Sequence, residues 1–200
     1  MSQEHYFSAD PSKPATFREI EFDVGGKGFR AMTASGTFSI TRLDPGTKIL
    51  LENYAEFPEE GNVLDLGCGW GPISLAIAGH SQATTVWALD VNQRSLQLVA
   101  ENSKTNGLAN IKAVTQDQIP DGIKFTGIWS NPPIRVGKVV LHELLETWLP
   151  RLEEGGRAML VVQKQLGADS LLAWIQERFP DLTATRFSTD KGYRILEVVR

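Results

Sequence analysis

Three alternating glycines at the end of an apolar run are the strongest sign of chemistry in this 200-residue sequence. The run Val63–Leu66 has the length and composition of a buried strand, and Gly67, Gly69 and Gly71 follow it before a helical pattern begins. Glycine lets the backbone turn with positive φ and removes the Cβ atoms that would keep a ligand away from the main chain. We therefore expect a small-molecule ligand to pass close to this turn.

The positions of the acidic residues indicate which ligand that would be. The glycines do not follow the G-x-G-x-x-G pattern of dinucleotide sites, and Asp65 precedes them. S-adenosylmethionine (SAM) needs no pyrophosphate site, because its cationic sulfonium and ammonium groups and neutral ribose favour a carboxylate and backbone carbonyls. Asp90 closes the next apolar run, where an acid accepts hydrogen bonds from ribose hydroxyls. We expect SAM to be bound by Asp65, Gly67, Cys68, Gly69, Gly71, Asp90 and Val91. Taken separately, the turn could be an ordinary strand-to-helix connection and Asp90 a helix cap.

Two further residues could recognise the adenine ring. Asp117 and Gln118 follow the third strand of the expected sheet, where a side-chain acceptor and a backbone amide could contact the adenine amino group and a ring nitrogen. The alternative is that Asp117 is a solvated loop acid before Pro120.

The fourth expected strand ends in Asn131-Pro132-Pro133, which predicts the acceptor atom. Two consecutive prolines stiffen the turn and push the residue before each into extended geometry. The Asn131 side-chain oxygen and the Pro132 carbonyl could then accept both hydrogens of one NH₂ group, which leaves the nitrogen lone pair directed at a methyl donor. We expect Asn131, Pro132 and Pro133 to form the catalytic site, with the Asn131 side chain also in contact with SAM. The alternative is that these residues form a stiff surface turn.

The elements that must position these residues alternate along the chain as in a wound α/β fold. Strands are expected at Asn62–Leu66, Thr84–Asp90, Ile111–Thr115, Gly127–Asn131, Arg157–Gln163, Leu182–Ser188 and Tyr193–Val199, and helices at Pro72–Gly79, Asn92–Asn106, Lys138–Leu152 and Ala168–Phe179. The last two strands are separated only by turn residues, so this mostly parallel sheet should end in an antiparallel hairpin. Before it we expect a β-hairpin, Ile20–Val24 with Phe29–Thr33, and a helix from Pro45 to about Phe57, capped by Asp44, covering the cofactor cleft.

Length and composition fit one cytoplasmic domain, with an extension over residues 1–60 and a SAM-binding core over residues 61–200. The only cysteine is Cys68, which excludes an intrachain disulfide, and no Cys and His spacing fits a metal site. No apolar run approaches the roughly 18 residues of a membrane span, so no membrane partner is expected. The net charge of −4 argues mildly against RNA as a partner, although a local basic rim could still contact phosphates.

Residues 62–134 resemble the class I methyltransferases, through Asp65–Gly71 for SAM and Asn131-Pro132-Pro133 for the branch that methylates amino groups. Nearly the whole chain, from His5–Ser8 through Gly36–Ser39 and Asp44–Thr47 onward, is similar to the small-domain enzymes related to ribosomal RNA guanine-N2 methyltransferases of the RsmC type. The resemblance implies a Rossmann-like fold, SAM as cofactor, and 16S-type ribosomal RNA or the small ribosomal subunit as partner.

Two departures from that family concern substrate recognition. Ile134 stands where the branch commonly has an aromatic residue to stack on the target base, so Phe38 or Trp70 would have to supply stacking, unless both belong to the core. Larger relatives carry a second, N-terminal domain, so RNA recognition here would rest on the cleft rim or on a homodimer. We expect a rim that contacts RNA phosphates, formed by Arg135 and Lys138 with Arg42, Lys48 and Arg94. The alternative is that these residues form a solvated charged face.

The sequence thus predicts a SAM-dependent N-methyltransferase acting on the N2 amine of a ribosomal RNA guanine. Methylation of a protein glutamine or a DNA adenine remains open, because Asn131-Pro132-Pro133 needs only a planar NH₂ group. A SAM-binding module without catalysis is the second alternative.

Overall fold

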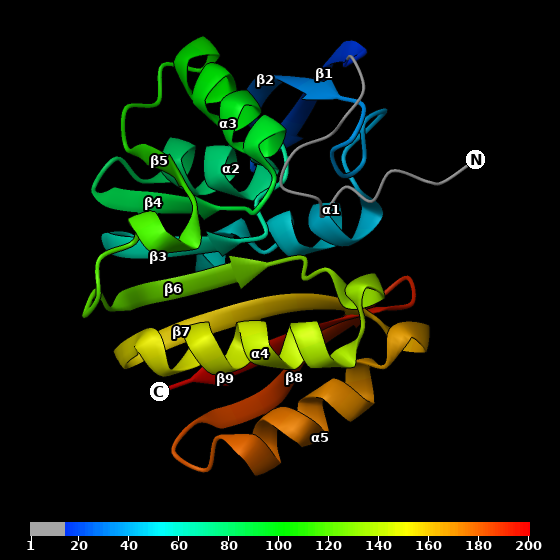
Figure 1. The fold of residues 1–200 in the computed structure, drawn as a ribbon, viewed down its shortest axis with the longest axis vertical. Coiled ribbons are helices and arrows are strands. Elements are labelled where there is room, and N and C mark those ends of the chain that lie inside the picture. Colours follow the sequence, from blue (N-terminus) through cyan, green and yellow to red (C-terminus); the bar gives the residue numbers. More distant parts are fainter. Residues whose placement is uncertain (1–14) are drawn as a thin grey trace.

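A seven-stranded sheet forms the centre of the computed structural model, which describes residues 15–200 (Figure 1). The strand order is β5-β4-β3-β6-β7-β9-β8, with β9 antiparallel to both of its neighbours and the other pairs parallel. The bounds are β3 Gly61–Leu66, β4 Thr84–Leu89, β5 Ile111–Val114, β6 Phe125–Ser130, β7 Leu152–Gln163, β8 Thr183–Asp190 and β9 Tyr193–Val199. The expected α/β sheet with its antiparallel end is confirmed. Strand order reverses between β3 and β6, which is where open α/β sheets bind ligands.

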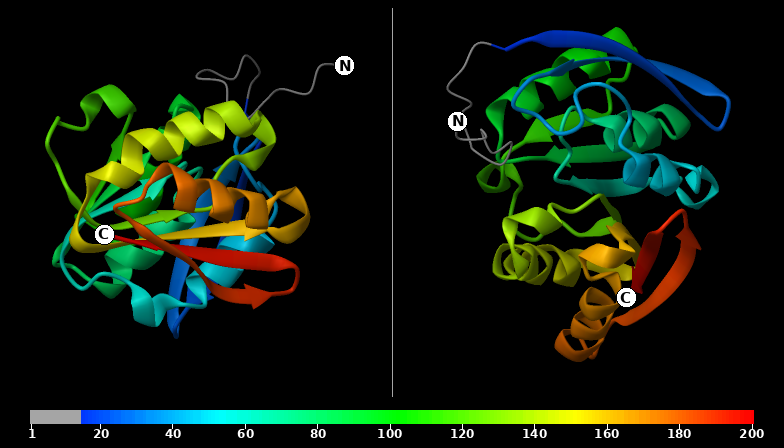
Figure 2. Two further views of the ribbon diagram at one scale, coloured as in Figure 1. Left: turned by 90° about the horizontal axis from the view of Figure 1, so that it is seen from below. Right: turned by 90° about the vertical axis from the view of Figure 1, so that its right-hand side faces the viewer.

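Helices cover both faces of the sheet. They are α1 (Pro45–Leu51), α2 (Pro72–His80), α3 (Gln93–Thr105), α4 (Lys138–Trp148) and α5 (Ala168–Arg178). Successive side chains of a strand point to opposite faces, so Leu64 and Leu66 pack toward α4 and α5, whereas Val63 packs toward α1 and α2. In the left view of Figure 2, α4 and α5 lie on one side of the sheet, and α1 lies on the other.

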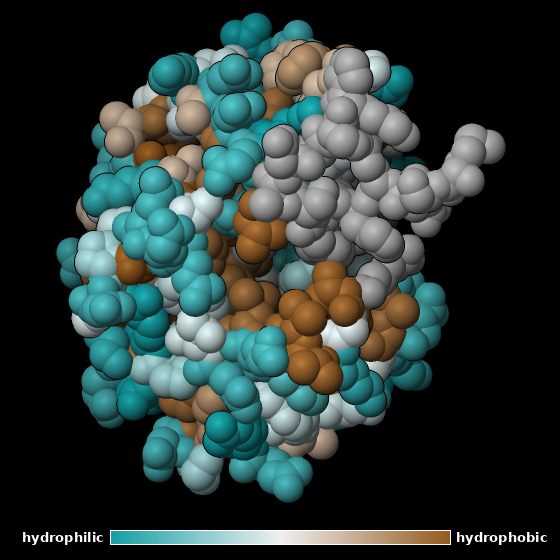
Figure 3. Space-filling model, in the orientation of Figure 1, coloured by the Kyte–Doolittle hydropathy of each residue, from teal (hydrophilic) through white to brown (hydrophobic). Residues whose placement is uncertain are grey.

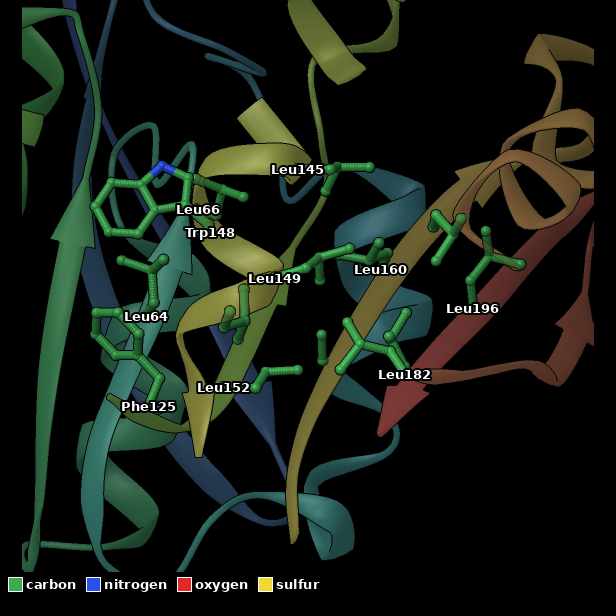
Figure 4. Packing of buried hydrophobic residues seen from close by; sticks show 14 of the residues in the cluster. Leu64, Leu66, Phe125, Leu145, Trp148, Leu149, Leu152, Leu160, Leu182 and Leu196 are labelled. Carbon is green, nitrogen blue, oxygen red and sulfur yellow. The ribbon is translucent and has the colours of Figure 1, made fainter. Parts of the chain in front are cut away.

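The core beneath α4 holds the central strands along their length (Figure 4). Leu66 of β3, Phe125 of β6 and Leu160 of β7 are buried against Leu145 and Trp148 of α4. Burial of one such side chain contributes about 1.5–3 kcal/mol. The loops that follow β3 and β6 are therefore held on a rigid base.

The N-terminal hairpin, β1 (Phe17–Val24) with β2 (Lys27–Ala34), docks onto α3 through two asparagines. Asn102 accepts from Met32 N at 2.7 Å and donates to Met32 O at 3.0 Å. Asn106, one turn later, makes the same pair of bonds with Arg30, at 3.1 and 2.7 Å. The match works because residues four apart on a helix and two apart on a strand have similar spacing.

Two helices end earlier than the sequence predicts. α1 stops at Leu51 instead of reaching Phe57, because Asn53 Nδ2 donates back to Ile49 O at 2.9 Å and a 3₁₀ turn follows at Tyr54–Glu56. α4 stops at Trp148 rather than Leu152, because Pro150 has no N–H to continue the α-helical hydrogen-bond pattern. A 3₁₀ turn, η4 (Leu149–Arg151), takes its place.

Over the described range 15–200, no helix is both long and apolar enough to cross a membrane. The segment His5–Ser8, on which part of the family resemblance rests, lies outside the described residues.

Candidate active site

One cavity of about 510 Å³ opens at the carboxyl ends of β3, β4 and β6. Figure 3 shows a hollow near the middle of this face, with apolar side chains gathered around it. Its walls are Phe38, Asp44, Leu66, Gly67, Gly69, Leu89, Asp90, Val91, Ser95, Gln116, Asn131, Pro132, Pro133, Ile134, Val136, Val140, Leu144, Gln163, Leu166 and Tyr193. The structure therefore brings Gly67 and Gly69 together with residues 90–91 and 131–134, as the sequence predicts. The hairpin does not line this cavity; the segment after it does, through Phe38 and Asp44.

The glycine turn presents bare backbone to the cavity. Gly67 and Gly69 line it with φ of 77° and 55°. Gly67 N and Cys68 N both donate to Leu89 O at 2.9 Å, which ties the turn to the end of β4. Gly71 lies outside the cavity wall. A Cβ on Gly71 would lie 2.9 Å from Val99 Cγ2, so this glycine allows α3 to pack closely against the turn. Cys68 is also outside the wall, and burial raises the pKa of its thiol.

Asp65 lies under the turn and does not line the cavity. Its Oδ2 accepts from Ser74 N at 2.9 Å and from Ser74 Oγ at 2.6 Å, and its Oδ1 is buried without a hydrogen-bond partner. Burial raises the pKa of this carboxyl from 3.8 to about 7, against the opposing effect of the Ser74 bonds. The side chain thus anchors the start of α2 below the glycine turn, and the ligand contact that the sequence predicts for it stays a prediction.

Asp90 reaches the cavity and also holds its wall together. Its Oδ2 accepts from Gly69 N at 2.9 Å and its Oδ1 accepts from Asn92 N at 2.9 Å. Burial raises the pKa of this carboxyl, and these backbone bonds oppose the rise. A carboxylate offers about four acceptor sites, more than these backbone bonds use, so Asp90 can still accept a bond from a ligand hydroxyl. Val91, beside it, is 56% exposed and lines the same cavity.

The loop after β5 places a different residue at the cavity than the sequence predicts. Gln116 lines it, whereas Asp117 and Gln118 do not. Gln118 Oε1 is used in a capping box with Thr115 N and Oγ1, at 2.9 and 3.0 Å. Asp117 is exposed. The short 3₁₀ turn η2 (Gln116–Gln118) decides which side chain points inward, and propensity alone does not show this.

The turn after β6 is rigid. Pro133 has φ −75° and ψ 69°, the centre of an inverse γ-turn, and Ile134 N donates to Pro132 O at 2.8 Å. Ser130 Oγ donates to Leu66 O at 2.6 Å and ties the end of β6 to the end of β3. The Pro132 carbonyl accepts one bond and keeps a second lone pair.

The Asn131 amide is held by the first turn of α1. Its Nδ2 donates to Asp44 Oδ2 at 2.8 Å and to Thr47 Oγ1 at 3.0 Å. Both amide hydrogens are used, so the amide oxygen is the group left to accept a bond at the cavity. The sequence analysis identified Asp44 as a helix cap and as part of the segment that carries the family resemblance, but it did not predict the bond to Asn131.

The other walls of the cavity are mostly apolar, with aromatic side chains at two places. Phe38 and Ile134 line it as expected, and Tyr193, which the sequence analysis missed, lines it from the start of β9. Trp70 belongs to the core: it is 2% exposed and its Nε1 donates to Ser39 O at 3.3 Å. Among the described residues, Phe38 and Tyr193 are thus the aromatic ones at the cavity, in a site that lacks an aromatic at Ile134.

Of the two basic residues expected beside the turn, Lys138 lines a second hollow of about 220 Å³. Ile134 and Leu166 line both hollows, and the stacked rings of His142 and Trp174 line the second. The side chain of Arg135 lies outside the described part of the structure. The other expected rim residues, Arg42, Lys48 and Arg94, line neither hollow, and Arg94 Nη1 donates to Ser35 O at 2.7 Å.

Comparison with known proteins finds a family model that matches most of this chain. The family model described as "Methyltransferase small domain" matches residues 28–197. The chain is 34% identical over 197 residues to the uncharacterized protein YbxB of Bacillus subtilis (strain 168), with 97% of each chain covered.

Other relatives are longer than this chain. Ribosomal RNA small subunit methyltransferase C of Shewanella piezotolerans is 34% identical over 69% of this chain, which spans 41% of that protein. The release factor glutamine methyltransferase of Fusobacterium nucleatum is 32% identical over 72% of this chain, which spans 40% of it. Among solved structures, the T. thermophilus 16S rRNA N2 G1207 methyltransferase (RsmC), in complex with AdoMet and guanosine, has a TM-score of 0.79 at 23% identity, covering 95% of this chain and 52% of that one.

Proposed function

Since this chain belongs to the methyltransferase small-domain family and is a SAM-dependent methyltransferase, we propose that its acceptor is the exocyclic N2 amine of a guanine in 16S-type ribosomal RNA. The observation that carries the proposal is the Asn131 amide, held by Asp44 and Thr47 with its oxygen free, in the wall of the cavity that the glycine turn also lines. The similarity to ribosomal RNA small subunit methyltransferase C supports the choice of acceptor.

The residues at the β3 and β4 ends fit SAM. Asp90 would accept the ribose hydroxyls, and Gly67 and Gly69 would let the cofactor lie against the backbone. Val91 and Gln116 line the same end and would contact the adenine. Bound SAM supplies an electrophilic methyl group on a sulfonium that is already a good leaving group.

The residues at the β6 end would orient the acceptor. Asn131 Oδ1 would accept one hydrogen of the amine, and the second lone pair of the Pro132 carbonyl would accept the other. With SAM bound, the nitrogen lone pair would then be directed at the methyl group that SAM supplies. The methyl group would pass from sulfur to nitrogen, S-adenosylhomocysteine would be the leaving group, and the nitrogen would afterwards lose a proton to solvent. No general base is needed, so the rate comes from orientation and from exclusion of water.

An RNA base fits the remaining walls. Phe38 and Tyr193 offer aromatic faces for stacking, the way in which proteins hold splayed-out RNA bases. Ile134 and Leu166 connect this cavity to the hollow lined by Lys138, whose ammonium group would contact a phosphate of the same strand. The partner is then ribosomal RNA or the small ribosomal subunit.

A protein glutamine is the second candidate acceptor. Its side-chain NH₂ group is planar like that of guanine, and the release factor glutamine methyltransferase relative favours it.

The deciding experiment is mass spectrometry of nucleosides from ribosomal RNA of cells with and without the gene. Loss of one N2-methylguanosine from small-subunit RNA is expected. Unchanged RNA nucleosides together with loss of a methylglutamine from a protein would establish the second candidate instead.

A further inference from the structure

We infer that Asp44 and Thr47 are positioning residues that fix which end of the Asn131 amide faces the acceptor. The inference rests on the proposed role of Asn131 as the residue that accepts a hydrogen bond from an amine. It goes beyond that role because it assigns the orientation of the Asn131 amide to Asp44 and Thr47, which are far in sequence from Asn131-Pro132-Pro133.

The chemistry of the two partners determines the orientation. A carboxylate has acceptors and no donor, so the amide atom 2.8 Å from Asp44 Oδ2 must be the NH₂ nitrogen. Thr47 Oγ1, 3.0 Å from the same nitrogen, accepts the second hydrogen. The bond to the carboxylate is charge-assisted and stronger than a neutral one.

The oxygen and the NH₂ group of an amide are nearly equal in shape. Without the bonds to Asp44 and Thr47, the Asn131 side chain could therefore adopt either orientation. An amide turned by half a rotation would present its NH₂ group to the NH₂ group of the acceptor, and two donors cannot bond to each other. Asp44 and Thr47 therefore select the productive orientation before the substrate arrives.

The Asp44–Thr47 turn makes several contacts that fit this role. Asp44 Oδ2 also accepts from Thr47 N at 3.1 Å, so the atom that caps α1 is the atom that holds Asn131. Pro45 occupies the first helical position. A Cβ on Gly46 would lie 2.9 Å from Tyr193 Cε1, so this glycine lets the Tyr193 ring approach α1. One helical turn thus contacts both Asn131 and an aromatic wall of the cavity.

The first test uses variants that separate helix capping from amide orientation. Asp44→Ser keeps a good N-cap but is too short to reach Asn131, and Thr47→Val removes the hydroxyl with little change in shape. We expect each to lower kcat for RNA methylation by about 10-fold or more, the scale of losing a hydrogen bond to a charged or preorganised group, with SAM affinity and melting temperature nearly unchanged. Thr47→Ser should restore the parent rate. Thr105→Val is the matched control, because the Thr105 hydroxyl bonds only within α3.

The second test needs no substrate, so its outcome is independent of the proposed acceptor. In ¹⁵N NMR spectra the Asn131 side-chain amide protons, identified by their absence from Asn131→Ala, should exchange slowly with water in the parent protein and quickly in Asp44→Ser. A parent-like amide signal in Asp44→Ser would overturn the inference, as would a kcat that falls only in proportion to melting temperature. Slow exchange in the parent that is lost in both variants would support it even if RNA is not the acceptor.

Discussion

Gly69 N donates to Asp90 Oδ2 at 2.9 Å, so the carboxylate at the end of β4 holds the glycine turn that follows β3. A single side chain thus shapes the cavity wall and remains available, through its second lone pairs, to a ligand hydroxyl. We therefore expect SAM binding to be sensitive to substitution of Asp90.

Asp90→Ala should therefore weaken SAM binding by about 1.5–3 kcal/mol, the scale of losing hydrogen bonds to a charged group. Isothermal calorimetry measures the affinity directly. Asp181→Ala is the matched control, because that carboxyl is exposed and outside the cavity wall, and it should leave the affinity nearly unchanged. Equal affinity of a folded Asp90→Ala protein and the parent would remove Asp90 from the ribose site.

Asp65 makes stability depend on pH in an unusual direction. Its folded pKa of about 7 is raised from 3.8, so between these values the native state holds a proton that the unfolded state has lost. The contribution of this group to stability is therefore present at low pH and lost as pH rises toward 7. Relative to Asp65→Asn, the free energy of unfolding of the parent should fall by a few kcal/mol between about pH 4 and pH 7, at about 1.4 kcal/mol per pH unit. Urea denaturation of both proteins across this range tests the sign; parallel curves would show that Asp65 ionises normally.

Lys138→Glu should reduce RNA affinity and the dependence of that affinity on salt, while SAM affinity stays the same. The reason is that a phosphate contact releases counterions, so one contact changes the salt slope by about one. Lys104→Glu carries the same charge change at the end of α3 remote from the cavity and serves as control. If both variants bind RNA equally well, Lys138 belongs to a solvated face and the proposed rim is wrong.

Local sequence patterns predicted most of the elements, because apolar periodicity and turn residues act over short distances. The β8–β9 hairpin is an example: its turn residues Lys191 and Gly192 both adopt positive φ, at 44° and 83°. The C-terminal end of α1 was missed because the Asn53 side chain, rather than a proline or glycine, stops that helix, whereas its start at Pro45 with Asp44 as the cap is confirmed.

The candidate site was predicted less completely, for a physical reason. Glycines 67 and 69, Asp90 and Asn131 sit at strand ends, and parallel strands bring their carboxyl ends to one edge. The bonds of Asn131 to Asp44 and Thr47, and the place of Tyr193 at the cavity, depend on contacts between distant segments that no local pattern encodes. Gln116 was missed because a 3₁₀ turn selects it over its neighbours.

The central claim, that Asn131 orients an acceptor amine, is tested most directly by single-turnover methylation of ribosomal RNA with the parent and Asn131→Ala, alongside SAM titration of both. The account predicts a methylation rate lower by about 100-fold or more with nearly unchanged SAM affinity, because a preorganised hydrogen-bonding group is lost only at the reacting centre. A variant that methylates at the parent rate would contradict the mechanism, and loss of SAM binding alone would reassign Asn131 to the cofactor.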